Sequence, residues 1–132
     1  MKPARRVKHV VLDAGALIAL DRGSGSVRGY ILLADRAKVA LSTSSAVVAQ
    51  VWRGGSRQAR LARFMGSDLV TEISLDPEAG RRIGVLAAAV GSRDVVDGHV
   101  ALIALDRDAV VLTSDPADIA RWGVPDEKIV RC

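Results

Sequence analysis

The stretch "VKHVVLDAGALIAL", residues 7–20, decides the fold class. Its short apolar run does not alternate with polar residues, which is typical of a strand buried on both faces, and a helix start signal follows directly. Two later segments have the same layout, "KVALSTSSAVVAQVW" at 38–52 and "AVVLTSDPADIARW" at 109–122. Each of the three segments therefore predicts a strand that leads straight into a helix.

The rest of the chain continues this alternation. The segment "LVTEISL" at 69–75 is a fourth candidate strand, and "KIVRC" at 128–132 is a short fifth one. Further helical patterns lie at 24–36, 56–66, 76–90 and 94–106. Strands that alternate with helices predict a parallel sheet covered on both faces. Because the stretches richest in Pro and Gly, such as "RGSGS", "RGGS" and "GVPDE", fall at the joints, we expect one α/β domain over residues 1–132.

Composition limits the classes of protein that need to be considered. The 132 residues are 49% hydrophobic with a mean hydropathy of +0.21, which favours a buried core over disorder. No apolar run reaches the roughly 18 residues of a membrane span, and the basic start lacks a signal sequence, so we expect a cytoplasmic protein. Cys132 is the only cysteine, which excludes an intrachain disulfide and a cysteine metal site.

The charge favours a partner that carries phosphate. Lys and Arg number 19 against 15 Asp and Glu, for a net charge of +4, and most of the basic residues are arginine. Guanidinium groups match the geometry of phosphate oxygens. Aromatic residues make up only 3%, which argues against modules that hold single strands by stacking.

Acidic and hydroxyl side chains follow the predicted strands. Asp13, Ser42 to Ser45 and Asp115 each come just past a strand, so they are expected at one edge of the sheet. Asp13 and Asp115 approach each other if their strands are neighbours. The stretch "DVVDGHVALIA" at 94–104 opens a helix that runs into the last of these strands, and the connectivity permits its amino end to lie at the same edge.

Helix capping explains each aspartate taken singly. Asp13 and Asp94 precede helical patterns, Asp97 lies in a first turn, and Asp115 precedes Pro116, a favoured first helical residue. Taken together they predict a cluster, because capping says nothing about where other caps should lie. Clustered carboxylates repel one another, and a hard cation such as Mg²⁺ or Mn²⁺ relieves that repulsion. Such an acidic metal site suits hydrolysis of a phosphodiester.

These residues resemble those of PIN-domain ribonucleases, and among them the VapC-type toxins of bacterial toxin–antitoxin pairs. The matching pieces are "VVLDAGALIAL", "STSSAVVAQVWRGG", "DVVDGHVALIA" and "VVLTSDPADI", in family order over about residues 8–120. The resemblance implies a three-layer α/β/α sandwich with a parallel sheet. It also implies Mg²⁺- or Mn²⁺-dependent endonucleolytic cleavage of RNA, a cognate antitoxin protein and a homodimer. Asp13, Asp97 and Asp115 would be metal ligands, and Asp94 matches a position that is often acidic.

The chain departs from the family at Gln50. The family usually has a glutamate there, in a pattern like "S-x-x-x-x-A-E", whereas this chain has "SSAVVAQ", and its first glutamate is Glu72. Glutamine keeps one carbonyl oxygen, which can ligate a metal or orient a water, but it lacks the charge. We therefore expect either weaker metal affinity, partly offset by Asp94, or a silent nuclease in which Gln50 is an ordinary helix residue.

Other polar residues are candidates for supporting roles. Arg53, Arg57, Arg60 and Arg63 recur at helical spacing, as either a track for the RNA backbone or a solvated helix face.

Hydroxyl groups are the next candidates. Thr43, Thr113 and Ser114 are placed to hydrogen-bond the acidic ligands or a phosphate. His99, two residues after Asp97, points away from it on a helix, so packing or a hydrogen bond is expected there.

Three other classes of protein can be compared with the sequence. A nucleotide-binding module lacks support because the glycine-rich "DRGSGSVRG" follows a helical pattern and no G-K-[ST] occurs. A phosphatase with Asp13 as nucleophile wants a second acid two residues later, where Gly15 stands. A non-catalytic binding protein of the same fold, in which the aspartates only cap helices, remains an alternative that Gln50 favours.

Overall fold

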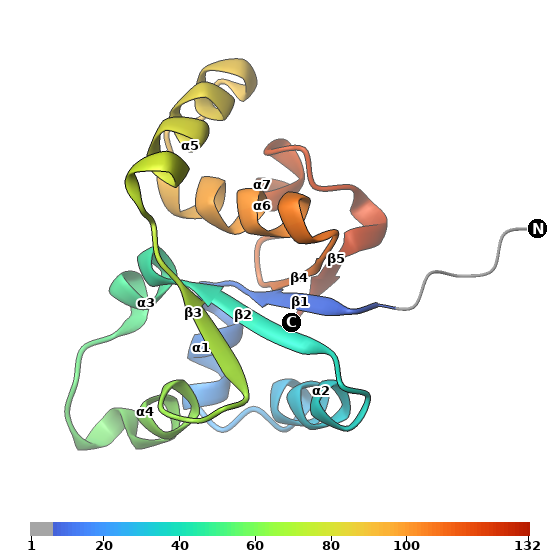
Figure 1. Cartoon of the computed structure of the whole chain (residues 1–132). Helices are drawn as coiled ribbons and strands as arrows, with labels where there is room; N and C mark the ends of the chain where they lie inside the picture. The colour runs from blue at the N-terminus through green and yellow to red at the C-terminus, as the bar shows by residue number, and fades with distance from the viewer. Residues whose placement is uncertain (1–6) are drawn as a thin grey trace, which may run out of the picture.

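A central parallel sheet organises the chain, whose computed structural model describes residues 7–132 (Figure 1). The five strands are β1 (His9–Leu12), β2 (Ala40–Ser44), β3 (Val70–Ile73), β4 (Val110–Thr113) and β5 (Ile129–Arg131). They lie in the order β3-β2-β1-β4-β5, and every neighbouring pair is parallel. The predicted α/β class with a central parallel sheet is confirmed.

Helices cover both faces of this sheet. They are α1 (Ala14–Asp21), α2 (Gly25–Arg36), α3 (Ser45–Val51), α4 (Ala59–Met65), α5 (Pro77–Val90), α6 (Val95–Arg107) and α7 (Pro116–Arg121), with 3-10 turns η1 (Ser56–Gln58) and η2 (Asp126–Lys128). Figure 1 shows α1, α2 and α4 on one face and α5, α6 and α7 on the other, as in a three-layer sandwich. Helix α3 lies at the edge and packs against both α1 and α6. Among residues 7–132 no helix combines the length and apolar composition needed to cross a bilayer.

The core explains why the apolar runs do not alternate. All residues of β4 are buried, as are Val10 to Leu12 of β1, because helices cover both sides of these central strands. Helix α6 is buried from Gly98 to Ala104 between the sheet and its neighbours. At Gly98 an added Cβ would lie 2.8 Å from the buried Trp122 ring and 2.9 Å from Ile83, so the three helices α5, α6 and α7 meet closely at this glycine.

The order of the strands reverses between β1 and β4. From β1 the chain goes to β2 and β3 on one side, and the later strands β4 and β5 lie on the other. Leu12 pairs with Leu112, and the Asp13 N–H donates to the Leu112 carbonyl at 3.0 Å, which extends the ladder to the first residue past β1. In parallel sheets with this topology, ligands bind at the carboxyl ends of the strands where the order reverses.

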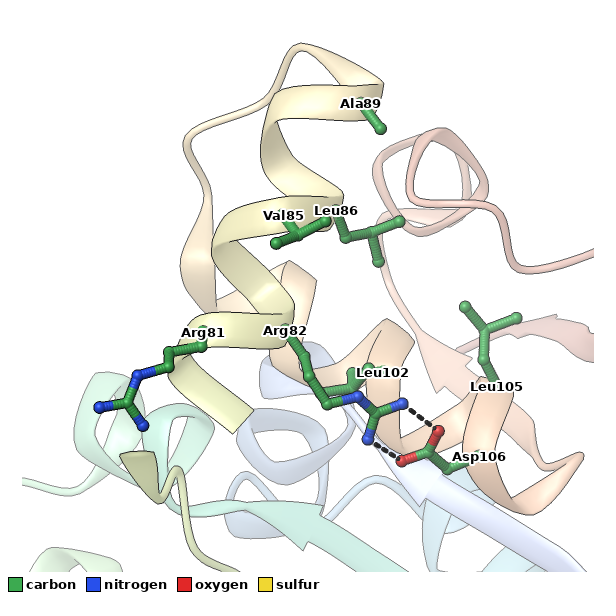
Figure 2. Close-up of a pocket in the computed structure, with 8 residues that line it drawn as sticks. All are labelled: Arg81, Arg82, Val85, Leu86, Ala89, Leu102, Leu105 and Asp106. Atoms are coloured by element: carbon green, nitrogen blue, oxygen red, sulfur yellow. Dashed lines mark hydrogen bonds and ion pairs between the residues drawn. The ribbon is translucent and has the colours of Figure 1, made fainter. Parts of the chain in front are cut away.

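An apolar hollow separates α5 from α6 (Figure 2). It measures about 530 Å³ and is lined by residues that include Leu86, Leu102 and Leu105. At one end Arg82 and Asp106 form a two-pronged ion pair of 2.8 and 2.7 Å, whereas Arg81 points away from that pair in Figure 2. Such an exposed pair adds little stability.

Two glycine-to-alanine substitutions should have opposite effects on stability. We expect Gly98→Ala to destabilise the fold by about 1–3 kcal/mol, because the new methyl overlaps the Trp122 ring and Ile83. Gly84→Ala, in α5 with nothing within 4 Å of the new Cβ, should stabilise by about 0.5–1 kcal/mol through helix propensity. The midpoints of urea unfolding measure both changes. Equal midpoints for the two variants would contradict the close contact at Gly98.

Candidate acidic site

Asp13 lies at the carboxyl end of β1 and is 4% exposed. Its Oδ1 accepts from the Ala14 N–H at 2.8 Å, and its Oδ2 accepts from the Thr113 hydroxyl at 2.7 Å. Burial raises the pKa of this carboxyl, the hydrogen bonds from Thr113 and Ala14 lower it, and the charges of Asp115 and Asp94 raise it further; the net direction is upward. Asp13 is thus a helix cap and also a buried acid that other acids face.

Thr113 joins the two strand ends at this edge. Its hydroxyl donates to Asp13 Oδ2 and accepts from the Asp115 N–H at 3.0 Å, so one side chain orients both acidic residues. Ser114 Oγ donates to Asp115 Oδ2 over a longer 3.4 Å. The third predicted hydroxyl, Thr43, lies elsewhere: it donates to the Leu12 carbonyl at 2.7 Å and contacts the backbone rather than an acid.

Asp94 and Asp97 enter from the amino end of α6. The Asp94 side chain caps this helix by accepting from the Asp97 N–H at 3.1 Å. Burial raises the pKa of Asp97 to about 7, and the charges of Asp94, Asp13 and Asp118 add to that rise. Helix α6 therefore brings its acids close enough to the end of β1 for the carboxylates to affect one another.

Asp118 is an acid near the site that the sequence reasoning did not single out. It lies in the first turn of α7 and lines a small hollow of about 140 Å³ together with Asp94, Asp97 and Arg121. Its signal in the sequence is the spacing of three residues from Asp115 in "SDPADI", which places two acids one helical turn apart.

Capping accounts for part of this cluster. Asp13 and Asp94 do cap α1 and α6 with their side chains. Asp115 occupies the N-cap position of α7 before Pro116, as expected, but its side chain makes no capping hydrogen bond. Asp97 lies inside the first turn of α6, where it contributes charge without capping. Capping therefore leaves the positions of Asp97 and Asp115 unexplained.

A buried hydrogen bond ties α3 to α6 behind the acids. Ser44 Oγ caps α3 by accepting from Ala46 N at 3.0 Å and Val47 N at 3.4 Å, and it lies 2.6 Å from His99 Nδ1. With both lone pairs of the hydroxyl used by the cap, its proton goes to Nδ1. Burial lowers the pKa of His99, which matches a neutral ring. The prediction of packing or a hydrogen bond for His99 is confirmed.

Gln50 lies on the exposed side of α3, outside the hollow that Asp94 and Asp97 share. It lines a separate hollow of about 260 Å³ together with Ile18, Arg22 and Arg53.

The predicted arginine track is divided between two hollows. Arg53 lies in the hollow of Gln50, whereas Arg60 and Arg63 line one of about 340 Å³ over Phe64. Arg57 is exposed in η1.

The donor set at the sheet edge fits a hard dication in its chemistry. Carboxylate oxygens are the ligands that Mg²⁺ and Mn²⁺ prefer, and a cation would relieve the repulsion from Asp94, Asp13 and Asp118 that adds to the effect of burial on the pKa of Asp97. Within residues 7–132, however, no three Asp, Glu, His or Cys side chains are arranged as a ready-made metal site. Asp13, Asp94, Asp97 and Asp115 are the residues that would supply oxygen ligands to an ion at this edge.

Comparisons with known proteins do not assign a family. No protein-family model matches the chain, and no curated protein is significantly similar to it. The resemblance to PIN-domain ribonucleases therefore stays a prediction that rests on the four motifs, and the chemistry of the site is argued from its own residues.

The metal-free protein should lose stability as the pH rises. Asp97 has a pKa of about 7 in the folded state against an ordinary 3.8, so between these values the folded state holds the extra proton. The contribution of Asp97 to stability is therefore fully present below about pH 4 and is lost as the pH rises to about 7. We expect Asp97→Asn to flatten this dependence and, in EDTA at pH 8, to raise stability by roughly 1–2 kcal/mol. Thermal unfolding between pH 4 and 8 measures both; a stability difference between wild type and Asp97→Asn that stays constant over this window would contradict the placement of Asp97.

Proposed function

We propose that this protein is a divalent-metal-dependent endoribonuclease that hydrolyses RNA phosphodiesters. The observation that carries the proposal is the meeting of aspartates from three elements, the end of β1, the start of α6 and the end of β4, where the strand order reverses. The net charge of +4 adds a surface that attracts a polyanion.

The residues divide the work as follows. Asp13, Asp94, Asp97 and Asp115 would hold Mg²⁺ or Mn²⁺, and the bound ion would supply an activated water and neutralise charge on the scissile phosphate. Thr113 orients Asp13 and Asp115 through its two hydrogen bonds. The Ser44–His99 hydrogen bond fixes the amino end of α3 against α6, the helix that carries Asp97.

The proposal extends to the partners that the resemblance implies. The protein would be the toxin of a toxin–antitoxin pair, acting in the cytoplasm and neutralised by a cognate antitoxin protein. Self-association as a homodimer is supported by the exposed apolar face of α5 and α6, where Val85 is 75% exposed beside the hollow of Figure 2.

A second function is a catalytically weakened or inactive PIN-like module that binds RNA or protein. Two observations favour it: no ready-made group of three metal-binding side chains exists within residues 7–132, and Gln50 lines a hollow of its own. In that case the aspartates would cap helices and repel one another without turnover.

Cleavage of a labelled RNA tests the proposed function. We expect the purified protein to cleave single-stranded or structured RNA with Mg²⁺ or Mn²⁺ and to stop in EDTA. Asp97→Asn should reduce the rate by about a hundredfold or more, because a negative ligand is lost. Asp68→Asn, an exposed residue just before β3 at the opposite edge of the sheet, is the matched control and should cleave like wild type.

Two results would contradict the nuclease assignment. One is cleavage that persists in EDTA, which would exclude a metal-dependent reaction. The other is an Asp97→Asn variant as active as Asp68→Asn, with circular dichroism showing both folded.

A further inference from the structure

Two adjoining hollows run along the exposed side of α1 and begin beside the acidic site. The first has a volume of about 570 Å³. It is lined by Gly15, which follows Asp13 by two residues, and by Ser114, which directly precedes Asp115. Arg22 and Ser24 also line it, farther along α1. The second, of about 260 Å³, is the one that contains Gln50 and Arg53. Both are lined by Ile18 and Arg22, so they adjoin each other along α1, and we call the two hollows together the α1 groove.

Close packing at one glycine brings the groove to the acids. A Cβ at Gly15 would overlap the Ser114 side chain, so only glycine lets the loop after β4 lie directly on α1. Ser114 thereby borders the groove while its hydroxyl donates to Asp115. Ser114 is therefore the point at which the groove adjoins the acidic site.

The far wall of the groove is held in place by Gln58. Its Oε1 accepts from Arg53 N at 2.7 Å and Gly54 N at 3.0 Å, and its Nε2 donates to the Val51 carbonyl at 2.8 Å. These three bonds fix the loop after α3, in which Gly54 has a φ of +76°. Arg53 is thus presented by an ordered loop rather than by a free chain end.

The charges of the groove suit a phosphate backbone. Arg22 and Arg53 line it, and within residues 7–132 neither forms an ion pair. Asp21 also lines the second hollow, but its Oδ1 accepts from Leu61 N at 3.2 Å, at the amino end of α4. The Arg53 guanidinium also donates to the Trp52 carbonyl at 2.8 Å, which leaves its charge uncompensated. Two such guanidinium groups along a groove that adjoins an acidic site can hold a polyanion that the acids alone would repel.

The geometry points to the α1 groove as the binding path for one RNA strand next to the scissile phosphate, an inference that rests on the proposed function. Arg22 and Arg53 hold backbone phosphates, and the neutral amide of Gln50 contacts a ribose or base beside them. An unpaired strand can follow a depression of this kind, whereas duplex RNA is bound mainly across its shallow minor groove. Arg60 and Arg63, which line the neighbouring hollow, take no part.

Binding of a fluorescein-labelled single-stranded RNA, in the Asp97→Asn background and in EDTA, tests this path separately from cleavage. We expect Arg22→Glu to weaken binding by about tenfold and to lower the salt dependence by the equivalent of about one to two phosphate contacts. Arg81→Glu has the same charge change on α5, across the sheet from α1, and should weaken binding less than about threefold because salt screens it. Equal losses in the two variants, or a larger loss in Arg63→Glu, would overturn the path.

Intrinsic fluorescence gives an independent readout. Trp52, next to Arg53, is 41% exposed, whereas the other tryptophan, Trp122, is 1% exposed. RNA should change the emission of the wild type and leave Trp52→Phe unchanged. An RNA-dependent change that persists in Trp52→Phe would place the strand elsewhere, and so would duplex RNA that binds as tightly as the single strand.

Gln50→Glu separates the groove from the metal site. If the amide faces RNA, the added negative charge beside Arg22 and Arg53 weakens RNA binding about threefold or more without raising cleavage. Increased cleavage and tighter Mn²⁺ binding would instead place Gln50 among the metal ligands and overturn its role in the groove. If RNA binding depends on Arg22 but no cleavage occurs, only the proposed nuclease activity is rejected. If cleavage occurs at the same rate in Arg22→Glu, only the groove as a binding path is rejected.

Discussion

The parallel pairing of β1 with β4 is the contact on which the site depends. It aligns Leu12 with Leu112, and the Asp13 N–H continues the ladder by one more hydrogen bond. Thr113 then faces Asp13 across the pair and holds Asp115 through its backbone. A slip of the register by one residue would turn Thr113 to the other face of the sheet and separate the two acids. Core packing of both strands prevents that slip, because Val10 to Leu12 are buried on both sides.

The same aspartates both stabilise helices and oppose one another. Asp13 and Asp94 accept hydrogen bonds from N–H groups at the amino ends of α1 and α6 and so cap both helices. Burial, together with the charges of Asp94 and Asp13, raises the pKa of Asp97 to about 7. The buried length of α6, from Gly98 to Ala104, holds the helix in place against this repulsion. Most residues of a protein favour its folded state, and residues that oppose it, as these carboxylates do by repelling one another, are expected at functional sites.

Local sequence patterns were sufficient to predict the strands and the fold class. They did not show which elements pack against one another. The apolar runs predicted the central strands because burial on both faces leaves a continuous signal, as at Val110 to Leu112. The partly buried strands β3 and β5 were also predicted, from "LVTEISL" and "KIVRC". The sequence analysis could only say that Asp13 and Asp115 would meet if β1 and β4 were neighbouring strands. The local sequence of a strand does not specify which strand it pairs with. The arginine spacing did not show how Arg53 lies relative to Arg60 and Arg63, because Gly54 and Gly55 have positive φ angles and separate Arg53 from α4, which begins at Ala59. Arg22 gave no signal at all, because its place in a groove depends on how α1 meets α3.

The neighbours of Gln50 explain why a neutral side chain suits this position. It lines the same hollow as Arg22 and Arg53, on a short helix whose amino end Ser44 and His99 hold in place. A glutamate there would attract those guanidinium groups and compete with phosphate for them. A neutral amide leaves both arginines available and still offers a donor and an acceptor. A neutral side chain at position 50 would weaken the binding of a metal ion but favour the binding of a phosphate. A role for Gln50 as a metal ligand and a role in the groove therefore require opposite charges at this position.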